Sequence, residues 1–258
     1  MQKIKLGIFG CQGRMGKDII NEVSNYEEFV LSGLCESNNH SSVGSEINNC
    51  TVTDDIDKLI DSCDVIIDFT LPTGTINLLK AMQKKKSVCL VTGTTGYSDK
   101  NEIEFQKLVK GLKVIRSFNM SVGVNLLKKV SEIAANSIGG MSDIEIIETH
   151  HNKKKDAPSG TALSLAHSVN KGLGMKGHYV FREKNSDRSR KENEIGMSSI
   201  RGGDIIGIHS VLFFLKDQTI EFKHTAHNRN IFSRGSLDAA RWISSKKPGL
   251  YSVIDMLG

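Results

Sequence analysis

The sequence lacks the cysteine pairs on which disulfide frameworks and structural zinc sites are built. Its five cysteines are odd in number and dispersed over the first ninety residues, and no two of them form a Cys-x-x-Cys pair. This pattern argues against a disulfide framework and against a zinc site, and it fits a reducing cytosol. We therefore expect a cytoplasmic protein without a bound metal.

Long apolar runs are also missing. The longest, such as residues 211–215, are far shorter than the ~20 residues of a membrane-spanning helix, and the start MQKIKLGIFG has no signal-peptide layout. The sequence contains neither a long basic arm nor a basic helix interleaved with aromatic residues, so neither a membrane nor a nucleic-acid partner is expected. The net charge of +5, from 34 basic and 29 acidic residues, suits a small anionic substrate.

What the sequence does contain is an ordinary globular composition and a regular alternation of elements. Its 258 residues, 38% of them apolar, allow one large or two modest domains. Over roughly the first 120 residues, short apolar runs alternate with helical patterns, which predicts a Rossmann-like α/β domain with a doubly wound parallel sheet. The expected strands are residues 4–9, 29–35, 64–69, 87–91 and 113–115, and the main expected helices are 17–23, 75–83, 99–110 and 122–138.

The pattern changes after residue 140, where strand-like alternation becomes longer. Longer strands are expected at 144–149, 205–214 and 218–225, with a single clear helix at 159–172. We therefore predict a mixed α+β second domain over residues 122–231 and a first domain of residues 1–121, onto which residues 232–258 pack back. The highly charged stretch 182–191 is interpreted as an exposed loop without a chemical role.

The first expected strand runs into a turn with three glycines, Gly10, Gly13 and Gly16, and a helical pattern follows. This is the context of a dinucleotide-binding site, because glycines let the backbone approach a pyrophosphate closely. The spacing is Gly-x-x-Gly-x-x-Gly rather than Gly-x-Gly-x-x-Gly, so an ordinary turn is the alternative. Arg14 could reach a phosphate or lie on the surface. Glu36 follows the second strand and could bind ribose hydroxyls while repelling a 2′-phosphate; otherwise it is a loop carboxylate.

Three further loops follow expected strands, at residues 70–73, 93–95 and 117–120. Ligands of open α/β sheets bind at the carboxyl ends of the strands. We therefore expect all three loops on the cofactor edge of the first domain.

Residues 148–162, ETHHNKKKDAPSGTA, combine more chemically active groups than any other stretch. They are interpreted as a strand end, a basic loop and a helix start, with Pro158 in the first turn and Ser159 or Thr161 as the cap. The amides of Ser159, Gly160 and Thr161 are expected to point at a carboxylate or phosphate. The lysines add positive potential, and a histidine transfers protons near neutral pH. The alternative is a solvated basic loop before an ordinary helix.

Two adjacent histidines, His150 and His151, stand at the expected strand end. Neighbouring strand residues point to opposite faces, so only one of the two is expected to face a site. The spacing itself leaves open which one.

The stretch 148–162 resembles the signature of the dihydrodipicolinate reductase (4-hydroxy-tetrahydrodipicolinate reductase) family of lysine and diaminopimelate biosynthesis, Glu-x-His-His-x-x-Lys-x-Asp-Ala-Pro-Ser-Gly-Thr-Ala. The matching residues are Glu148, His150, His151, Lys154, Asp156, Ala157, Pro158, Ser159, Gly160, Thr161 and Ala162. The resemblance covers most of the chain from Lys5 to Trp242. It implies an oxidoreductase that reduces a cyclic dicarboxylate, 4-hydroxy-tetrahydrodipicolinate, to tetrahydrodipicolinate with NADH or NADPH. It also implies a homotetramer formed through the second, substrate-binding domain.

The resemblance further implies roles for single residues of this stretch. His150 would donate or accept a proton, and Lys154 would be a second proton donor. The carboxylates of the substrate would be held by His151, Lys154, Gly160 and Thr161. His209, His224 and His227 are interpreted as structural or surface residues.

For the cofactor, the resemblance implies contacts over the glycine turn and the strand-end loops. The implied residues are Gly10, Cys11, Gln12, Gly13, Arg14, Met15, Glu36, Gly93, Thr94, Thr95, Ser117, Phe118, Asn119 and Met120. Family members often carry a basic residue directly after the acidic one that corresponds to Glu36. Here Ser37 and Asn38 follow, which favours NADH over NADPH.

Two other classes of protein remain open. One is a different oxidoreductase of similar architecture, such as an amino-acid or inositol-type dehydrogenase. The other is a nonenzymatic NAD-binding sensor, which would bind a nucleotide and an anion without turnover.

Overall fold

The computed structural model describes residues 3–181 and 188–258, and the chain divides into two compact units. The first unit comprises Met1–Ser121 and Asn230–Gly258, and the second comprises Val122–Arg229. Of the charged loop expected at 182–191, residues 182–187 lie outside the described residues.

The first unit is built on an eight-stranded sheet in the order β13-β7-β6-β5-β1-β2-β4-β3. All strand pairs are parallel except β3 with β4, which confirms the predicted doubly wound parallel sheet. Its strands are β1 (Ile4–Phe9), β2 (Phe29–Cys35), β3 (Glu46–Ile47), β4 (Cys50–Thr53), β5 (Val65–Asp68), β6 (Cys89–Thr92), β7 (Lys113–Arg116) and β13 (Gly249–Tyr251). The central strands β5 and β6 are buried along their whole length, as parallel strands covered on both faces must be.

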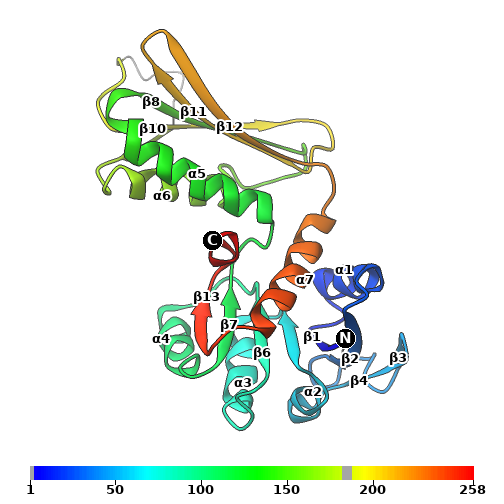
Figure 1. Ribbon diagram of the computed structural model, residues 1–258. Helices are drawn as coiled ribbons and strands as arrows, with labels where there is room; N and C mark the ends of the chain where they lie inside the picture. Colours follow the sequence, from blue (N-terminus) through cyan, green and yellow to red (C-terminus); the bar gives the residue numbers. More distant parts are fainter. Residues whose placement is uncertain (1–2, 182–187) are drawn as a thin grey trace. The chain divides into compact units, whose positions relative to one another are not determined.

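Helices cover both faces of this sheet (Figure 1). One apolar cluster joins the sheet to α1 and α7, and the other joins it to α2, α3 and α4. The helices are α1 (Arg14–Glu22), α2 (Ile56–Ser62), α3 (Pro72–Met82), α4 (Asp99–Leu108) and α7 (Asn230–Ser244). The chain runs outward from β1 to β2 and β4, then crosses to β5 on the other side of β1. That switch point is where open α/β sheets bind ligands.

Several elements of the first unit differ from the sequence-based expectation. α3 begins at Pro72 rather than at residue 75, because the fixed φ of proline suits the first turn of a helix. α1 begins at Arg14 rather than at residue 17, so Gly16, the third glycine of the motif, lies in the helix. β3, β4 and α2 were not expected, since each is too short to carry a clear period.

The second unit pairs two helices with a five-stranded mixed sheet in the order β12-β11-β8-β10-β9. β8 pairs in parallel with β10 and antiparallel with β11, which confirms the predicted mixed sheet. Its elements are α5 (Val122–Ile138), β8 (Asp143–His150), α6 (Gly160–Gly172), β9 (His178–Phe181), β10 (Glu194–Arg201), β11 (Gly207–Leu215) and β12 (Gln218–Ala226). β9 and β10 were not expected from the sequence.

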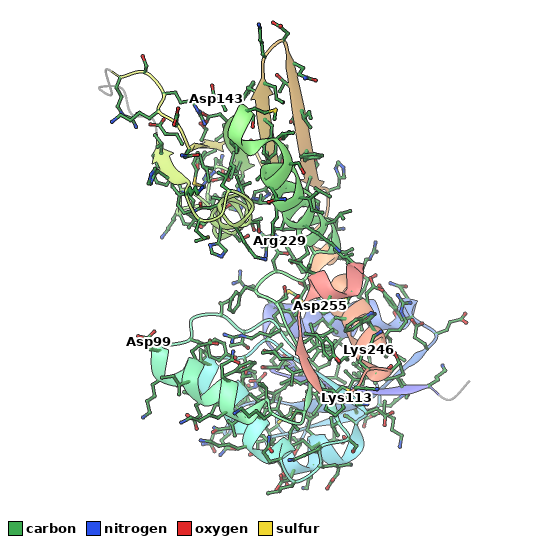
Figure 2. All side chains as sticks on the ribbon, turned by 60° about the vertical axis from the view of Figure 1, so that its left-hand side comes forward. Asp99, Lys113, Asp143, Arg229, Lys246 and Asp255 are labelled. Carbon is green, nitrogen blue, oxygen red and sulfur yellow. The ribbon has the colours of Figure 1, made fainter. Side chains whose placement is uncertain are left out.

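Alternation along β8 sets the two faces of this sheet. Ile144, Ile146, Glu148 and His150 are buried, whereas the residues between them are less so. The buried apolar members pack with α5 and α6, which lie on one face of the sheet in Figure 1. Figure 2 draws the side chains of the chain and labels Asp143, at the start of β8, and Arg229, the last residue of the second unit. The buried face of β8 therefore ends in two polar side chains.

Candidate active site

The glycine turn joins β1 to α1 at the carboxyl edge of the first sheet. Gly10 has a φ of +81°, and a Cβ at this position would lie 2.7 Å from Cγ2 of Thr70. A Cβ on Gly16 would lie 2.3 Å from the carbonyl oxygen of Gly10, so the helix packs directly on the turn. Gly13 is the N-cap of α1, and the first-turn amides of such a helix attract phosphate. The other predicted cofactor residues of the turn and helix start are Cys11, Gln12, Arg14 and Met15.

Glu36 directly follows β2 and borders the same turn. Its carboxylate accepts hydrogen bonds from the backbone amides of Gln12, at 3.0 Å, and Ser37, at 2.9 Å. Glu36 and Asp54 both line a pocket of about 540 Å³ beside the glycine turn. Among the described residues, its lining includes no lysine or arginine. Hydroxyl groups can donate hydrogen bonds to such carboxylates, whereas phosphate groups are repelled by them.

A buried carboxylate ties the loops after β5 and β6 together. Oδ1 of Asp68 accepts the backbone amide of Thr70, at 2.9 Å, and the hydroxyl of the same residue, at 2.6 Å. Oδ2 accepts the hydroxyls of Thr75, at 2.5 Å, Thr92, at 2.9 Å, and Thr94, at 3.3 Å. Burial raises the pKa of Asp68, while the hydrogen bonds from Thr70, Thr75 and Thr92 oppose that rise. The predicted cofactor residue Thr94 is thus part of this network.

Other predicted cofactor residues differ in how far they reach solvent. Gly93 packs on Phe69, since a Cβ at residue 93 would lie 2.1 Å from that ring, and Thr95 is exposed. Cys11 and Met120 are buried in the core cluster beneath the turn and the loop. Both side chains therefore pack in the core rather than reach solvent.

The loop after β7 is held by its own side chains. The Ser117 hydroxyl donates to the carbonyl oxygen of Asn119, at 2.7 Å, and the Ser121 amide donates to Asn119 Oδ1, at 2.9 Å. The Arg116 guanidinium lies 5.0 Å from the ring centre of Phe118, which is 66% exposed. The loop therefore presents an exposed aromatic ring at the edge where parallel strands bind ligands.

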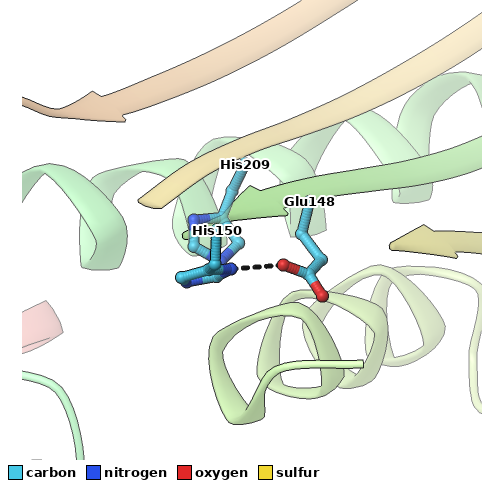
Figure 3. Close-up of side chains that lie close together, drawn as sticks. All are labelled: Glu148, His150 and His209. Atoms are coloured by element: carbon cyan, nitrogen blue, oxygen red, sulfur yellow. Dashed lines mark hydrogen bonds and ion pairs between the residues drawn. The ribbon is translucent and has the colours of Figure 1, made fainter. Parts of the chain in front are cut away.

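In the second unit, three polar side chains meet at the end of β8 (Figure 3). Glu148 and His150 lie on the same face of the strand, and the His150 Nδ1 makes a short hydrogen bond to Oε2 of Glu148. His209 faces them from β11, where its Cα pairs with that of Glu148, and its ring lies edge-on to His150 at 5.1 Å. Arg201, at the end of β10, donates to both oxygens of Glu148, at 3.0 and 2.7 Å.

The charges of this cluster follow from its burial. Burial raises the pKa of the Glu148 carboxyl, but hydrogen bonds from Arg201, Ser199 and His150 outweigh it and hold the pKa below its usual value. Burial lowers the pKa of His150, and the charge of Glu148 only partly offsets this. Burial and the neighbouring His150 lower the pKa of His209 to about 4. At neutral pH, Glu148 is therefore ionised and both histidines are neutral.

The start of α6 differs from the expectation in two details. Ser159 is the N-cap, and its hydroxyl accepts the amide of Ala162 at 3.2 Å, but its own amide donates to Glu148 Oε1 at 3.3 Å. The Ser159 amide was expected to point at a bound carboxylate or phosphate. Instead, the buried carboxylate of Glu148 is the anion at this helix start. Pro158 precedes the cap rather than lying in the first turn, which begins at Gly160.

The remaining predicted substrate residues surround this cluster. Lys154 pairs with Asp156 at 2.9 Å and is half-buried, whereas its neighbours in the lysine run, Lys153 and Lys155, are exposed. His151 follows the last residue of β8 and is half-buried. Gly160 and Thr161 open α6, and a Cβ on Gly160 would meet open space, so the helix start is accessible there.

Glu148, His150 and His209 could in principle hold a metal, since one ligand atom from each lies within 4.8 Å of the others. The geometry does not favour it, because Arg201 already neutralises the carboxylate and His150 Nδ1 is bonded to it. A cation would have to compete with a guanidinium for the same oxygens.

Comparison with known proteins assigns the family. Residues 4–120 match the N-terminal model of dihydrodipicolinate reductase, and residues 123–257 match its C-terminal model. A curated 4-hydroxy-tetrahydrodipicolinate reductase from Geotalea daltonii is 41% identical over 266 aligned residues, which cover 99% of each chain. The chain belongs to the dihydrodipicolinate reductase family.

Solved structures agree with this assignment. Dipicolinate-bound dihydrodipicolinate reductase from Paenisporosarcina sp. TG-14 superposes with a TM-score of 0.80 at 25% identity, covering 97% of this chain and 98% of that one. The apo scyllo-inositol dehydrogenase from Lactobacillus casei matches with a TM-score of 0.61 at 9% identity, covering 94% and 87% of the two chains. That second likeness shows a common fold alone. Within the parts of this family member that the structure describes, no helix has the length and apolar character to cross a membrane.

Two residues of this reductase-family site were missed or undervalued by the sequence analysis. His209 was interpreted as a structural or surface residue, and Arg201 was not assigned any role. Arg201 lies beside His150 and His209 beside Glu148 through the strand pairing of β8 with β10 and β11. A correct register for the sheet would have found both.

Proposed function

We propose that the chain reduces 4-hydroxy-tetrahydrodipicolinate to tetrahydrodipicolinate with a hydride from NAD(P)H, in lysine and diaminopimelate biosynthesis. Family membership over nearly the whole chain supports this reaction. The structural observation that carries it is the buried Glu148–His150 pair, with Lys154 four residues further on. This pair is suited to moving a proton beside a bound anion.

The nicotinamide, when bound, supplies the hydride, and the chain supplies position, charge and protons. His150 is the proton donor or acceptor of the proposed reaction, and Lys154 is the second donor. A bound dicarboxylate brings two negative charges, which favour the protonated form of a neighbouring imidazole. His151, Lys154 and the amides of Gly160 and Thr161 hold the carboxylates at the start of α6.

The cofactor site of the proposal comprises the glycine turn, Glu36 and the loops after β6 and β7. We assign NADH as the preferred cofactor, because the pocket at Glu36 also carries Asp54 and its described lining includes no basic side chain. Two carboxylates would repel the 2′-phosphate of NADPH.

The cofactor preference is tested by Glu36→Ala. We expect the KM for NADH to rise roughly tenfold, because two ribose hydroxyls lose a charged acceptor worth about 1.5 kcal/mol or more. The KM for NADPH should change much less, since the repulsion is removed together with the acceptor. Equal weakening of both cofactors would remove the ribose role of Glu36.

We further propose that the enzyme is cytoplasmic and homotetrameric. Its five cysteines are free thiols, as the reducing cytosol favours.

The second sheet has an exposed apolar face. Ile200 and Phe214, which are 51% and 40% exposed, pair with residues of β8 that point away from α5 and α6, so both side chains lie on that face. An exposed apolar sheet face suits association of copies. Light scattering of the purified protein gives the number of subunits.

The reaction itself is tested by the loss of reduced-nicotinamide absorbance, with the cyclic imine made in situ by the preceding synthase. Oxidation should require every component. We expect His150→Gln and Lys154→Ala to lower kcat by about 100-fold or more, whereas the matched exposed lysines, changed in Lys153→Ala and Lys155→Ala, should have little effect. Equal losses for all three lysines would mean that the run acts only as diffuse charge.

A failed assay would also be informative. Activity on an amino acid or polyol, with none on the imine, would favour another dehydrogenase. Nucleotide binding without any turnover would favour a sensor.

A further inference from the structure

The charge cluster at the end of β8 contains a buried carboxylate that is bonded on every side by fixed donors. Glu148 is 1% exposed. Its Oε1 accepts from the Ser159 amide and Arg201 Nη2, and its Oε2 accepts from Arg201 Nη1 and His150. A carboxylate in such a frame cannot rotate away without breaking several bonds at once.

The sheet itself fixes the donors. Arg201 and His150 are paired residues of β10 and β8, and Ser159 caps α6 beside them. Glu148 and His150 are two residues apart on one strand, so both point to the same face. The arginine, carboxylate and imidazole therefore form a chain that is set by strand register rather than by a loop.

This arrangement decides which nitrogen of the imidazole carries the proton. An ionised carboxylate only accepts hydrogen bonds, so His150 Nδ1 must be the donor in their short contact. Neutral His150 then has its lone pair on Nε2. A Cβ at Gly207 would lie 3.1 Å from that Nε2, so glycine leaves the space beside this nitrogen unfilled.

We infer that Glu148, held by Arg201, is a positioning residue that keeps the proton of His150 on Nδ1 and thereby presents Nε2 as the atom that exchanges a proton with the substrate. The inference deepens the proposed function and rests on it for the role of Nε2. The proton balance is simple: Nε2 takes or gives one proton, Nδ1 keeps its own, and Glu148 stays ionised throughout. Arg201 neutralises the carboxylate, so the resting cluster has no net charge when His150 is neutral.

His209 fits this arrangement as a neutral neighbour. Its Nε2 lies 3.2 Å from the Ser159 hydroxyl, and its ring packs edge-on against His150. Being uncharged at neutral pH, it adds no positive charge that would oppose protonation of His150. It therefore supports the ring of His150 without competing for the proton.

The test reads the tautomer directly, by ¹⁵N NMR of histidine-labelled protein, with the His150 signal identified in His150→Gln. We expect protonated Nδ1 and unprotonated Nε2 in the wild type at pH 7.5. In Glu148→Gln the side-chain amide can donate to the ring, so we expect a shift towards Nε2–H and a fall in kcat of about 100-fold or more, with KM changed less than about threefold. The acid limb of the pH profile should move to lower pH, because the carboxylate no longer stabilises protonated His150.

The chain offers a matched control on the same strand. Glu145 also pairs with an arginine, Arg190, but from the other face of β8. Glu145→Gln removes an equivalent charge and should leave the His150 tautomer and kcat unchanged. Arg201→Lys keeps the charge but loses the bidentate geometry, and we expect an intermediate fall in kcat.

Several outcomes would overturn the inference: an Nε2–H tautomer in the wild type, a wild-type kcat in Glu148→Gln, or an equal loss in Glu145→Gln. The wild-type tautomer is measured without Glu148→Gln, so it remains decisive if that variant fails to fold. It also needs no turnover. An Nδ1–H tautomer in protein without reductase activity would support the positioning role and reject the proposed reaction.

Discussion

Each of the two units buries one carboxylate at the carboxyl end of a strand, and the two are compensated differently. Asp68, at the end of β5, is 0% exposed and accepts its hydrogen bonds from threonine hydroxyls and one backbone amide. Glu148, near the end of β8, is equally buried but pairs with Arg201 and His150. The first has neutral partners, and the second has a cation.

The difference appears in the direction of each pKa. Burial dominates at Asp68 and raises its pKa, whereas at Glu148 the bonds from Arg201 and others outweigh burial and lower it. A carboxylate that only ties loops together can be held by hydroxyl groups. These groups donate to the ionised form and can accept a hydrogen bond from the protonated form. At Glu148, the fixed guanidinium of Arg201 favours the ionised form, which can orient the imidazole of His150. The charge of the partners therefore distinguishes Asp68, to which we assign a structural role, from Glu148, which we propose orients His150.

The largest expected effect tests whether the stabilisation at Glu148 comes mainly from one ion pair, the pair with Arg201. Glu148→Ala and Arg201→Ala should each destabilise the second unit by about 3 kcal/mol, because each leaves the opposite charge buried and unpaired. The double variant should cost clearly less than the sum, since it leaves neither charge behind. Scanning calorimetry of the four proteins measures this coupling. Strict additivity would mean that the two charges do not stabilise one another.

Asp68 should show the opposite, distributed behaviour. Thr75→Val and Thr92→Val each remove one of several neutral donors, and we expect each to cost about 1 kcal/mol. Trp242, the single tryptophan, lies in α7 of the first unit, so its fluorescence follows unfolding of that unit. Thr51→Val, at an exposed position of β4 outside the described contacts of Asp68, provides a threonine control. A loss of about 3 kcal/mol from either network threonine would contradict a distributed network.

The features of the two units that depend on neighbouring residues in the sequence could be predicted. Five strands of the first unit, β1, β2, β5, β6 and β7, were found because buried runs such as residues 65–67 are apolar throughout. The basic stretch after β8 was found because His150, Lys154 and the residues at the start of α6 lie within one short segment. Functional residues that lie close together in the sequence can be recognised without knowledge of the fold.

What the sequence did not predict depends on strand register. Arg201 is 53 residues from Glu148, and His209 is 50 residues from Ser159. β10, which carries Arg201, has buried residues in its first half and exposed ones in its second, so no period marks it as a strand. The orientation of the Ser159 amide likewise depended on a carboxylate on another element.

The stability of the two units should respond to pH in opposite senses. Asp68 binds its proton more tightly when folded, so its contribution falls as pH rises from the ordinary carboxyl pKa, about 3.9, towards its raised value. Glu148 binds its proton less tightly when folded, so its contribution is present above its ordinary pKa and is lost as pH falls through the lowered value.

Asp68→Asn and Glu148→Gln isolate these contributions. As pH rises across the carboxyl range, the stability difference between wild type and variant should shrink for Asp68→Asn and grow for Glu148→Gln. Unfolding free energies measured between pH 3 and 6 provide the comparison. The same sign for both variants would remove the distinction between the two carboxylates.

The smallest expected effect concerns the glycines beside the two carboxylates. The side-chain space at Gly93 is filled by the Phe69 ring, whereas that at Gly207 borders Nε2 of His150, 3.1 Å from an added Cβ. Gly207→Ala should therefore shift the imidazole by a few tenths of an ångström and lower kcat about threefold, with little change in stability. Gly202→Ala, in the loop between β10 and β11, adds a Cβ that meets open space and should have no effect on kcat. If the loss acts through His150, it should disappear in the background of His150→Gln; a threefold loss that persists there would place the effect elsewhere in the sheet.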